Sequence, residues 1–263
     1  MPLSDVNPKH KTIGVILAAG IGSRLRPYTI DCPKALVALD NGETILSRLT
    51  DQCKAVGVDE MLLVTGHCAD AVDTFLASNT LSLPTRTVFN PRFDTMNNGE
   101  SLNVVREAVQ GATIIKFDGD LVLHPDMLGR LAHAKRRSTI LLDATKVLVD
   151  EDYKAQVNPE TGLVTGLGKW LPNTASGVSI GIERIDVADQ AIVFDALHRM
   201  IHIDGHSDRY YEDAYYTVLD QGFALGFVST DGLPWIECDT ESELMEGRAL
   251  AAKFPAVRPN RNS

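Results

Sequence analysis

The sequence of 263 residues contains few cysteines, no long apolar run and no excess of positive charge. Its four cysteines, at positions 32, 53, 68 and 238, form no CxxC pair and follow no signal peptide, so we expect reduced thiols in a cytoplasmic protein. No apolar run approaches the length that crosses a bilayer. The formal net charge of −10 and the pI near 5.1 argue against nucleic acid or an anionic membrane as a partner, because no basic face compensates.

The apolar content of 44% over 263 residues is enough for one large α/β domain with a good core. We expect a single domain over residues 1–263, with an ordered core over about 11–254 and polar ends. Amphipathic segments alternate with short apolar runs, as where the helical pattern of Thr44–Val56 precedes the strand pattern of Met61–Thr65. This alternation predicts an α/β fold.

The stretch from Lys11 to Lys34 is the most informative part of the sequence. It opens with a run rich in β-branched residues, Ile13–Ala19, which predicts a strand buried on both faces. In the loop that follows, two glycines let the backbone pass close to a ligand, and arginine and lysine donors suit phosphate oxygens. The loop composition therefore indicates a polyanionic ligand.

Two common phosphate-binding motifs fit this loop poorly. A Walker loop needs Gly-Lys-Ser/Thr directly before a helix, whereas Gly22 is followed by serine and arginine. A dinucleotide fingerprint needs a third glycine, but Leu25 occupies that position, and Pro27 and Pro33 lie where the crossover helix should run. An ordinary glycine-rich turn with solvated arginines is the structural alternative, which the two prolines and the lysine disfavour.

Over its whole length the loop resembles the signature of nucleotidyltransferases that join an NTP to a phosphorylated sugar or alcohol, with matches at Leu17-Ala-Ala-Gly20, Gly22-Ser-Arg24, Pro27, Thr29 and Pro33-Lys34. The resemblance implies a three-layer α/β/α Rossmann-like fold with a mainly parallel central sheet and a small antiparallel excursion. It also implies that Arg24 meets the triphosphate and that Lys34 lies at the reacting phosphates. The loop residues implied to contact the nucleotide are Leu17, Ala18, Ala19, Gly20, Gly22 and Ser23.

A second polar loop, Asn97-Asn98-Gly99, precedes an amphipathic helix with Ser101 near its start. Taken by itself, this segment is typical of a turn followed by a helix N-cap. A methionine-containing loop that ends Asn-Asn-x-x-Ser-Leu also resembles the cytidylyltransferases that activate phosphocholine and similar phospho- or phosphono-compounds. That resemblance implies that Asn97, Asn98 and Ser101 lie near the cytosine, and it is the main reason to expect CTP.

Carboxylates end the predicted strand Ala112–Asp120, at the edge where open α/β sheets bind ligands. Asp118 and Asp120 would share one face of an extended chain, although a solvated junction with a turn at Gly119 is the simpler alternative. A nucleotidyltransferase needs a hard cation on the triphosphate, and carboxylate oxygens suit Mg²⁺. The resemblance implies Asp120 and Asp239, which follows the last predicted strand, as metal ligands, with Asp118 near the nucleotide.

Two segments are candidates for the acceptor side of the site. Spaced turns over about 145–180 predict a small antiparallel excursion, and in the resembled subgroup a lysine of such an excursion contacts the acceptor phosphate. Lys154 is the best match, with a surface lysine as the alternative. Four tyrosines flank two acids in Arg209–Tyr216, either as aromatic core with a capping acid or as an acceptor pocket for a cationic amine or polyol hydroxyls. The pocket residues would be Tyr211, Glu212 and Asp213.

These features together predict a Mg²⁺-dependent transfer of CMP from CTP to a small phosphorylated or phosphonylated alcohol or amine, with release of pyrophosphate. A phosphate or phosphonate dianion is already a nucleophile, so the protein must only align it and neutralise the leaving pyrophosphate. The alternatives are a sugar-1-phosphate uridylyl- or thymidylyltransferase and a nucleotide-binding regulatory module without turnover. The identity of the acceptor is left open, as is the oligomeric state, with a homodimer among the possibilities.

Overall fold

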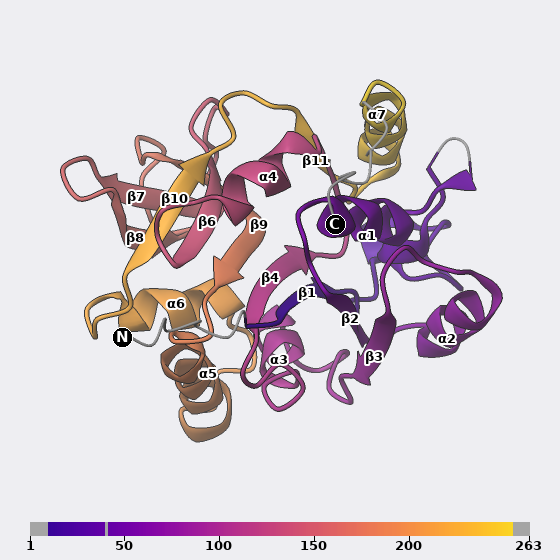
Figure 1. Cartoon of the computed structure of the whole chain (residues 1–263), viewed down its shortest axis with the longest axis horizontal. Helices are drawn as coiled ribbons and strands as arrows, with labels where there is room; N and C mark the ends of the chain where they lie inside the picture. The colour runs from indigo at the N-terminus through magenta and orange to yellow at the C-terminus, as the bar shows by residue number, and fades with distance from the viewer. Residues whose placement is uncertain (1–9, 40–41, 255–263) are drawn as a thin grey trace, which may run out of the picture.

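The computed structural model, drawn in Figure 1, describes residues 10–39 and 42–254. The polar ends expected before the first strand and after Phe254 lie outside the described residues. The described chain forms one nine-stranded mixed sheet in the order β3-β2-β1-β4-β9-β6-β10-β8-β7. A separate two-stranded sheet pairs β11 with β5.

One half of the large sheet is entirely parallel. Strand β1 lies between β2 and β4, and β3 forms the edge beyond β2. The predicted first strand is confirmed over residues 13–17, which are buried because helices cover both faces of the sheet at this point. The strands of this half are β1 (Thr12–Leu17), β2 (Glu60–Thr65), β3 (Thr85–Phe89) and β4 (Thr113–Asp118).

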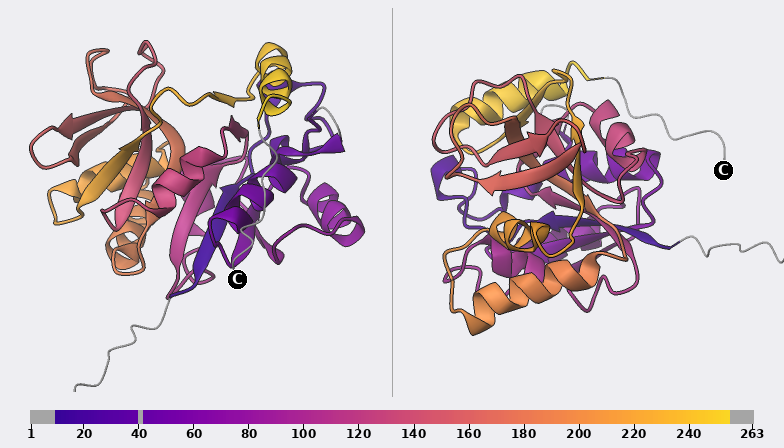
Figure 2. Two further views of the ribbon diagram at one scale, coloured as in Figure 1. Left: turned by 45° about the horizontal axis from the view of Figure 1, so that its top comes forward. Right: turned by 90° about the vertical axis from the view of Figure 1, so that its left-hand side faces the viewer.

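The other half of the sheet is largely antiparallel. Strand β9 runs antiparallel to both β4 and β6, β10 is parallel to β6, and β7 and β8 form a hairpin at the far edge. Figure 2 shows this hairpin at one end of the molecule and α2 at the other. The expected antiparallel excursion is thus part of the main sheet. Its strands are β6 (Ser138–Asp143), β7 (Lys154–Asn158), β8 (Leu163–Gly168), β9 (Gly177–Ile185) and β10 (Leu225–Ser229).

Helices pack on both faces of the sheet and give two separate apolar cores. Along β1, Val15 and Leu17 point into one core while Ile16 points into the other, as the alternation of a strand requires. One core is closed by α3 (Asn98–Asn103), α5 (Gln190–His198) and α6 (Tyr211–Leu219). The other is closed by α1 (Ile45–Ala55), α2 (Ala69–Ser78), α4 (Asp126–Ala132) and α7 (Glu241–Ala251). The three-layer α/β/α prediction is confirmed.

One strand boundary differs from the sequence prediction. The strand expected over Ala112–Asp120 stops at Asp118, where the chain turns closely over the end of β1 before β5 (Leu121–Leu123). Gly119 is required at this turn because a Cβ atom there would lie 2.5 Å from the carbonyl oxygen of Leu17. Helix α5 continues into a π-helical turn, Arg199–Ile203.

Within the described residues, no helix is both long and apolar enough to span a bilayer. All four cysteines are free, and Cys53 and Cys238 are buried.

Candidate active site

The glycine loop after β1 folds back so that its two ends meet. Gly22 adopts a φ of 62°, which favours glycine, and its carbonyl accepts a hydrogen bond from Thr29 Oγ1 at 2.7 Å. A Cβ atom at Gly22 would lie 3.1 Å from Lys34 Cγ. Arg24 and Lys34 therefore lie on the same side of the loop although ten positions separate them.

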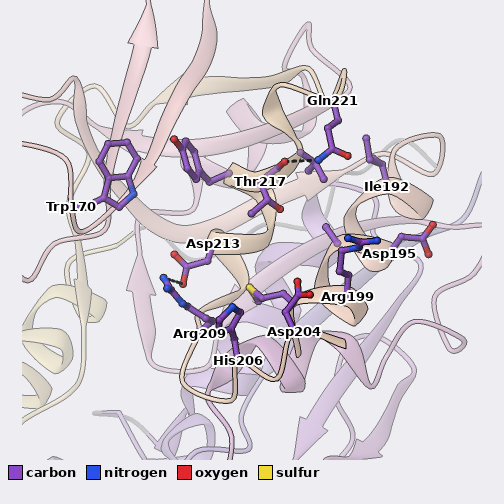
Figure 3. A pocket seen from close by; sticks show the side chains of 14 residues that line it. Trp170, Ile192, Asp195, Arg199, Asp204, His206, Arg209, Asp213, Thr217 and Gln221 are labelled. Carbon is purple, nitrogen blue, oxygen red and sulfur yellow. Dashed lines mark hydrogen bonds and ion pairs between the residues drawn. The ribbon is translucent and has the colours of Figure 1, made fainter. Parts of the chain in front are cut away.

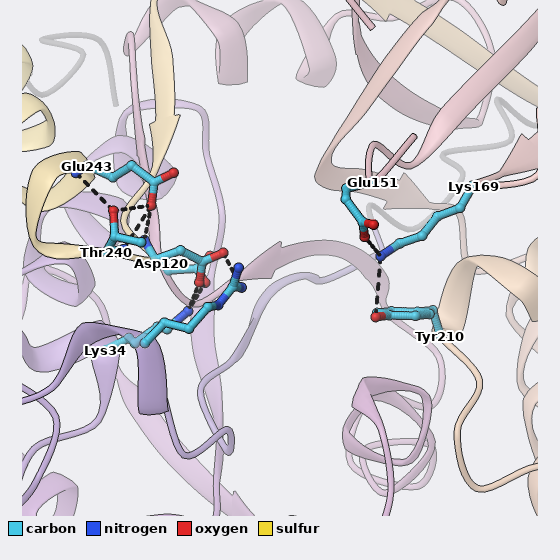
Figure 4. Close-up of polar contacts among 9 residues, drawn as sticks. Lys34, Asp120, Glu151, Lys169, Tyr210, Thr240 and Glu243 are labelled. Atoms are coloured by element: carbon cyan, nitrogen blue, oxygen red, sulfur yellow. Dashed lines mark hydrogen bonds and ion pairs between the residues drawn. The ribbon is translucent and has the colours of Figure 1, made fainter. Parts of the chain in front are cut away.

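Lys34 and Arg24 meet two carboxylates that come from distant parts of the chain (Figure 4). Lys34 Nζ donates to Asp120 Oδ2 at 2.8 Å and also to Asp239 Oδ1, so one ammonium bridges both acids. Arg24 Nη2 donates to Asp239 Oδ2 at 2.5 Å. The structure thus brings together the four residues for which the sequence predicted catalytic and metal-binding roles.

Local structure explains how Asp120 and Asp239 come together. Strand β11 (Trp235–Glu237) pairs antiparallel with β5, and the backbone N–H of Cys238 donates to the Asp120 carbonyl at 2.9 Å. Asp239 directly precedes Thr240, the N-cap of α7. In this capping box Thr240 Oγ1 accepts from the Glu243 N–H, and the Glu243 carboxylate accepts from the backbone N–H of Thr240 at 2.8 Å. Strand pairing and helix capping therefore fix the two acids.

Charge and burial perturb the ionisation of these groups. Burial raises the pKa of Asp120, and the nearby Asp118 adds to this, while Lys34 opposes it. Burial alone would lower the pKa of Lys34, but the two carboxylates outweigh it and raise the pKa above its ordinary value. Burial also raises the pKa of Glu237 to about 8, with Asp120 as the next contributor. The site therefore concentrates negative charge, which favours the binding of cations.

The two aspartates fit a magnesium ion that binds together with a nucleotide. Asp120 Oδ1 is buried and has no hydrogen-bond partner, Asp120 Oδ2 and Asp239 Oδ1 share the Lys34 ammonium, and Asp239 Oδ2 accepts from Arg24. The described residues contain no cluster of three or more histidine, cysteine or acidic side chains that would hold a metal alone. Mg²⁺ commonly takes one or two carboxylates and completes its shell with water and substrate phosphates. Asp120 and Asp239 would hold it here.

A cavity of about 390 Å³ opens beside this ion cluster. The basic pair Arg24 and Lys34 and four acidic residues line one side of it, and the loop before α3 lines the other. A smaller cavity of about 110 Å³ adjoins the glycine loop. Of the ten residues expected to contact nucleotide, Ser23 lines neither cavity. The residues that line one of them are Leu17, Ala18, Ala19, Gly20, Gly22, Asn97, Asn98, Ser101 and Asp118.

The Asn97-Asn98 loop is held by the segment before α6. Asn97 Oδ1 accepts from the Asn98 N–H at 2.8 Å as the cap of α3, and Asn97 Nδ2 donates to the Asp208 carbonyl at 2.9 Å. Asn98 Oδ1 accepts from the Tyr211 N–H at 3.2 Å. The amide of Asn97 is therefore engaged with backbone, whereas Asn98 has its amide nitrogen left for a ligand in the cavity that it lines.

The expected acceptor residue Lys154 is placed elsewhere by the structure. It is fully buried, and its ammonium donates to the carbonyl oxygens of Val149 at 3.0 Å and Asp150 at 3.2 Å. These contacts tie down the segment before β7, so the assignment of Lys154 to the acceptor is corrected. Figure 4 shows Lys169 opposite Lys34 and Asp120, and its Nζ lies 3.5 Å from the hydroxyl of Tyr210, which lines the 390 Å³ cavity.

The tyrosine-rich segment is mostly core. Tyr211 and Glu212 are buried and line neither cavity of the cleft, and Asp213 accepts a hydrogen bond from Tyr153 Oη at 2.7 Å. Asp213 also lines a larger hollow of about 1040 Å³ between α5 and α6 (Figure 3). That hollow contains none of the glycine-loop or ion-cluster residues, so it is separate from the candidate active site.

Among the residues that line the 390 Å³ cavity without having been singled out in the sequence are Glu237 and Tyr210. Glu237 lies two positions before Asp239, and the alternation of an extended chain was a signal that both face the same side. Tyr210 directly precedes α6, and nothing in the sequence distinguishes it from the neighbouring tyrosines.

Comparison with known proteins shows the family of this chain. The model of the MobA-like NTP transferase domain matches residues 14–147, which are 134 of the 263 residues and just over half of the chain. The chain belongs to this family. The matched range contains the glycine loop, Lys34, the Asn97-Asn98 loop and Asp120, but not Asp239.

Several proteins that are similar to this chain in sequence or in fold are named after related activities. CMP-5'-(3-aminopropyl)phosphonate synthase of Streptomyces rubellomurinus is 35% identical over 48% of this chain, but the match spans only 20% of that protein. Choline-phosphate cytidylyltransferase of Streptococcus pneumoniae is 29% identical, covering 65% of this chain and 75% of the relative. The inositol-1-phosphate CTP transferase of T. maritima has the same fold, with a TM-score of 0.76, 18% identity and coverage of 93% and 96%. Sugar-phosphate uridylyltransferases also occur among the relatives.

Proposed function

We propose that this protein transfers CMP from CTP to a small phosphorylated or phosphonylated alcohol or amine and releases pyrophosphate. The observation that carries the proposal is the position of Lys34, which bridges Asp120 and Asp239 at the wall of a cavity formed by the glycine loop and the Asn97-Asn98 loop. Cations and a pair of carboxylates at one end suit a metal-bound triphosphate, and amides at the other end suit a base. Residues 11–254 act as one catalytic domain in this proposal.

The base occupies the Asn98 end of the cavity. The free amide nitrogen of Asn98 is a donor that matches the acceptor atoms on the cytosine ring edge, N3 and O2. Ser101 lines the same cavity wall and receives a hydrogen bond from Asn90 Nδ2 at 3.0 Å. The names of two relatives, a CMP-aminopropylphosphonate synthase and a choline-phosphate cytidylyltransferase, favour cytidine over uridine.

The triphosphate lies against the glycine loop, Arg24 and Lys34. The acceptor dianion attacks the α-phosphorus in line, and the bond to the β-phosphate oxygen breaks as pyrophosphate leaves. Lys34 exchanges its contacts with the two aspartates for contacts with the phosphates, where negative charge grows on the leaving group. Mg²⁺ held by Asp120 and Asp239 would supply further neutralisation of that charge.

The acceptor enters from the side of Lys169. Its ammonium has two partners, Tyr210 at 3.5 Å and the exposed Glu151 at 3.8 Å, which are weak enough to be replaced by a phosphate or phosphonate. The rings of Tyr153 and Tyr210 meet edge to face at 5.6 Å beside the carboxylate of Asp213. Aromatic faces near acidic groups suit a cationic amine on the acceptor.

A screen of pyrophosphate release tests the proposal. The full-length protein with Mg²⁺ is combined with CTP, UTP, dTTP, ATP or GTP and with phosphocholine, 3-aminopropylphosphonate, inositol 1-phosphate or glucose 1-phosphate. We expect the highest kcat/KM with CTP and an amine-bearing acceptor. A higher kcat/KM with UTP or dTTP and glucose 1-phosphate would assign the protein to the sugar-phosphate branch. Nucleotide binding without turnover of any pair would indicate a regulatory module.

A further inference from the structure

A lysine is buried in the core directly beside the nucleotide cavity. Lys116, on β4, is fully buried, and its Nζ lies 3.1 Å from Asp118 Oδ1 and 3.2 Å from Glu183 Oε1. It also donates to the carbonyl oxygen of Gly181 at 3.1 Å. The ring of Tyr211 covers the ammonium, with a distance of 3.5 Å from Nζ to the ring centroid. Groups from β4, β9 and α6 therefore enclose Lys116.

Asp118 is the member of this group that reaches the cavity. Its side chain is 26% exposed and lines the 390 Å³ cavity. Lys116 holds Oδ1, and the Tyr211 hydroxyl donates to Oδ2 at 3.2 Å. A Cβ atom at Gly181 would collide with Oδ2, and the φ of 72° there also favours glycine. Since a carboxylate has about four lone-pair sites, both fixed oxygens can still accept from a ligand.

Stability alone is a poor explanation for this arrangement. Burial by itself would lower the pKa of Lys116, but the carboxylates of Asp118, Glu183 and Glu212 outweigh it and raise the pKa. Burial raises the pKa of Glu183 to about 7 and that of Glu212 well above its ordinary value. Buried ionic clusters are often no more stable than apolar packing of the same volume. The cluster holds the carboxylate of Asp118 at a fixed position on the cavity wall.

The order of contacts along the cavity wall locates Asp118 relative to a nucleotide. The Tyr211 backbone N–H donates to Asn98 Oδ1 at 3.2 Å, and the hydroxyl of the same residue donates to Asp118. Two residues after Asp118 comes Asp120, which accepts from Lys34 at 2.8 Å. Asp118 therefore lies between the base end, marked by Asn98, and the triphosphate end, marked by Lys34. The sugar is the part of a nucleotide that occupies this position.

We propose that Asp118 accepts hydrogen bonds from the ribose hydroxyls of the bound nucleotide and so selects ribonucleotides over deoxyribonucleotides. Lys116 and Tyr211 are positioning residues, which act by fixing the two oxygens of that carboxylate. The inference rests on the proposed nucleotidyltransferase function and assigns a specificity-determining residue within that site.

Equilibrium binding of ribo- and deoxyribonucleotides tests this inference without requiring turnover. Isothermal titration of the full-length protein with CTP, 2′-deoxyCTP and 3′-deoxyCTP, in Mg²⁺ and without acceptor, gives the preference for the ribose. A hydrogen bond to a charged group corresponds to about a tenfold to hundredfold preference for CTP in the unsubstituted protein. Asp118→Ala should bring the preference close to one, and Asp118→Asn, which keeps one acceptor oxygen, should give an intermediate value.

A pair of tyrosine variants separates positioning from structure. Tyr211 and Tyr215 are both fully buried on α6, but the hydroxyl of Tyr215 donates to Glu183 Oε1 at 3.1 Å and does not contact Asp118. Tyr211→Phe should lower the preference for CTP over its deoxy analogues several-fold. Tyr215→Phe is the matched control and should leave that preference unchanged, whatever it does to thermal stability. Lys116→Met should also lower the preference for CTP over its deoxy analogues. If Lys116→Met does not fold, Tyr211→Phe still tests the positioning of Asp118.

The results distinguish this inference from the proposed function. Equal binding of CTP and its deoxy analogues by the unsubstituted protein, or an unchanged preference in both Asp118→Ala and Tyr211→Phe, would overturn the role of Asp118 even if CTP is turned over. Tighter binding of UTP than of CTP would instead contradict the proposed cytidine specificity. The same titrations with UTP and 2′-deoxyUTP would then decide the ribose contact.

Discussion

Replacement of Lys34 tests whether this lysine and a metal ion compete for the same carboxylates. In the structure Lys34 Nζ contacts both Asp120, at 2.8 Å, and Asp239, and its side chain is only 19% exposed. A divalent cation that binds both carboxylates must therefore displace the ammonium. Lys34→Met keeps the length of the side chain and removes its charge, so Asp120 Oδ2 and Asp239 Oδ1 become available, while Asp239 Oδ2 stays paired with Arg24.

The expected gain in metal affinity follows from the contacts that no longer have to be broken. A hydrogen bond between charged groups contributes about 1.5–3 kcal/mol, which corresponds to roughly a tenfold to hundredfold change in affinity. We expect Lys34→Met to bind Mn²⁺ that much more tightly than the unsubstituted protein in the absence of nucleotide. Its kcat should fall by about a hundredfold or more, because a preorganised cation at the reacting phosphates is lost.

Electron paramagnetic resonance of free Mn²⁺ measures the affinity directly, and pyrophosphate release measures kcat. Lys169→Met is the matched control, since this lysine contacts Tyr210 of the same cavity but neither aspartate. Asp120→Asn in the Lys34→Met background should abolish the gain in Mn²⁺ affinity. Equal Mn²⁺ affinity in Lys34→Met and the unsubstituted protein would refute the competition, and an unchanged kcat would remove Lys34 from the catalytic group.

Three further predictions concern single side chains. In steady-state assays Arg24→Ala should raise the KM for CTP by a larger factor than it lowers kcat, because Arg24 binds the triphosphate both before and during the reaction. A loss confined to kcat would contradict this. Lys169→Met should raise the acceptor KM at an unchanged melting temperature, whereas Lys154→Met should lower the melting temperature because three backbone carbonyls lose their donor. A raised acceptor KM in Lys154→Met and a lowered melting temperature in Lys169→Met would restore Lys154 to the acceptor site. Burial raises the pKa of Glu183 to about 7, so its contribution to stability is complete below its ordinary pKa near 4.5 and is lost as pH rises through 7. Glu183→Gln should therefore reduce the fall in melting temperature between about pH 5 and 8 in thermal scans, and an undiminished fall would assign the pH dependence to other groups.

Local sequence determined the elements that are specified by neighbouring residues. The strand before the glycine loop follows from a short β-branched run, and the φ of 62° at Gly22 needs the residue found there. Thr44 and Thr240 cap α1 and α7 through capping boxes whose partners lie three positions away. Arg24 and Lys34 were recognised together because both belong to the motif of one loop, Gly20–Lys34.

Only the tertiary structure decided which distant side chains meet. Lys154 and Lys169 belong to the same hairpin region, and which of them faces the cleft depends on how β7 and β8 join the sheet beside β9 and β10. The ammonium of Lys154 donates to three backbone carbonyls of the segment before β7, whereas Lys169 lies beyond the end of β8.

The buried cluster around Lys116 was equally invisible in the sequence. Its members come from β4, β9 and α6, and Glu183 lies 67 positions after Lys116 in the chain. A charged residue within a strand normally indicates a solvent-exposed face, and here helix α6 covers that face. Sequence patterns report the period of each element, but the pairing of elements depends on long-range packing, which is why the partners of Asp118 emerged only from the folded chain.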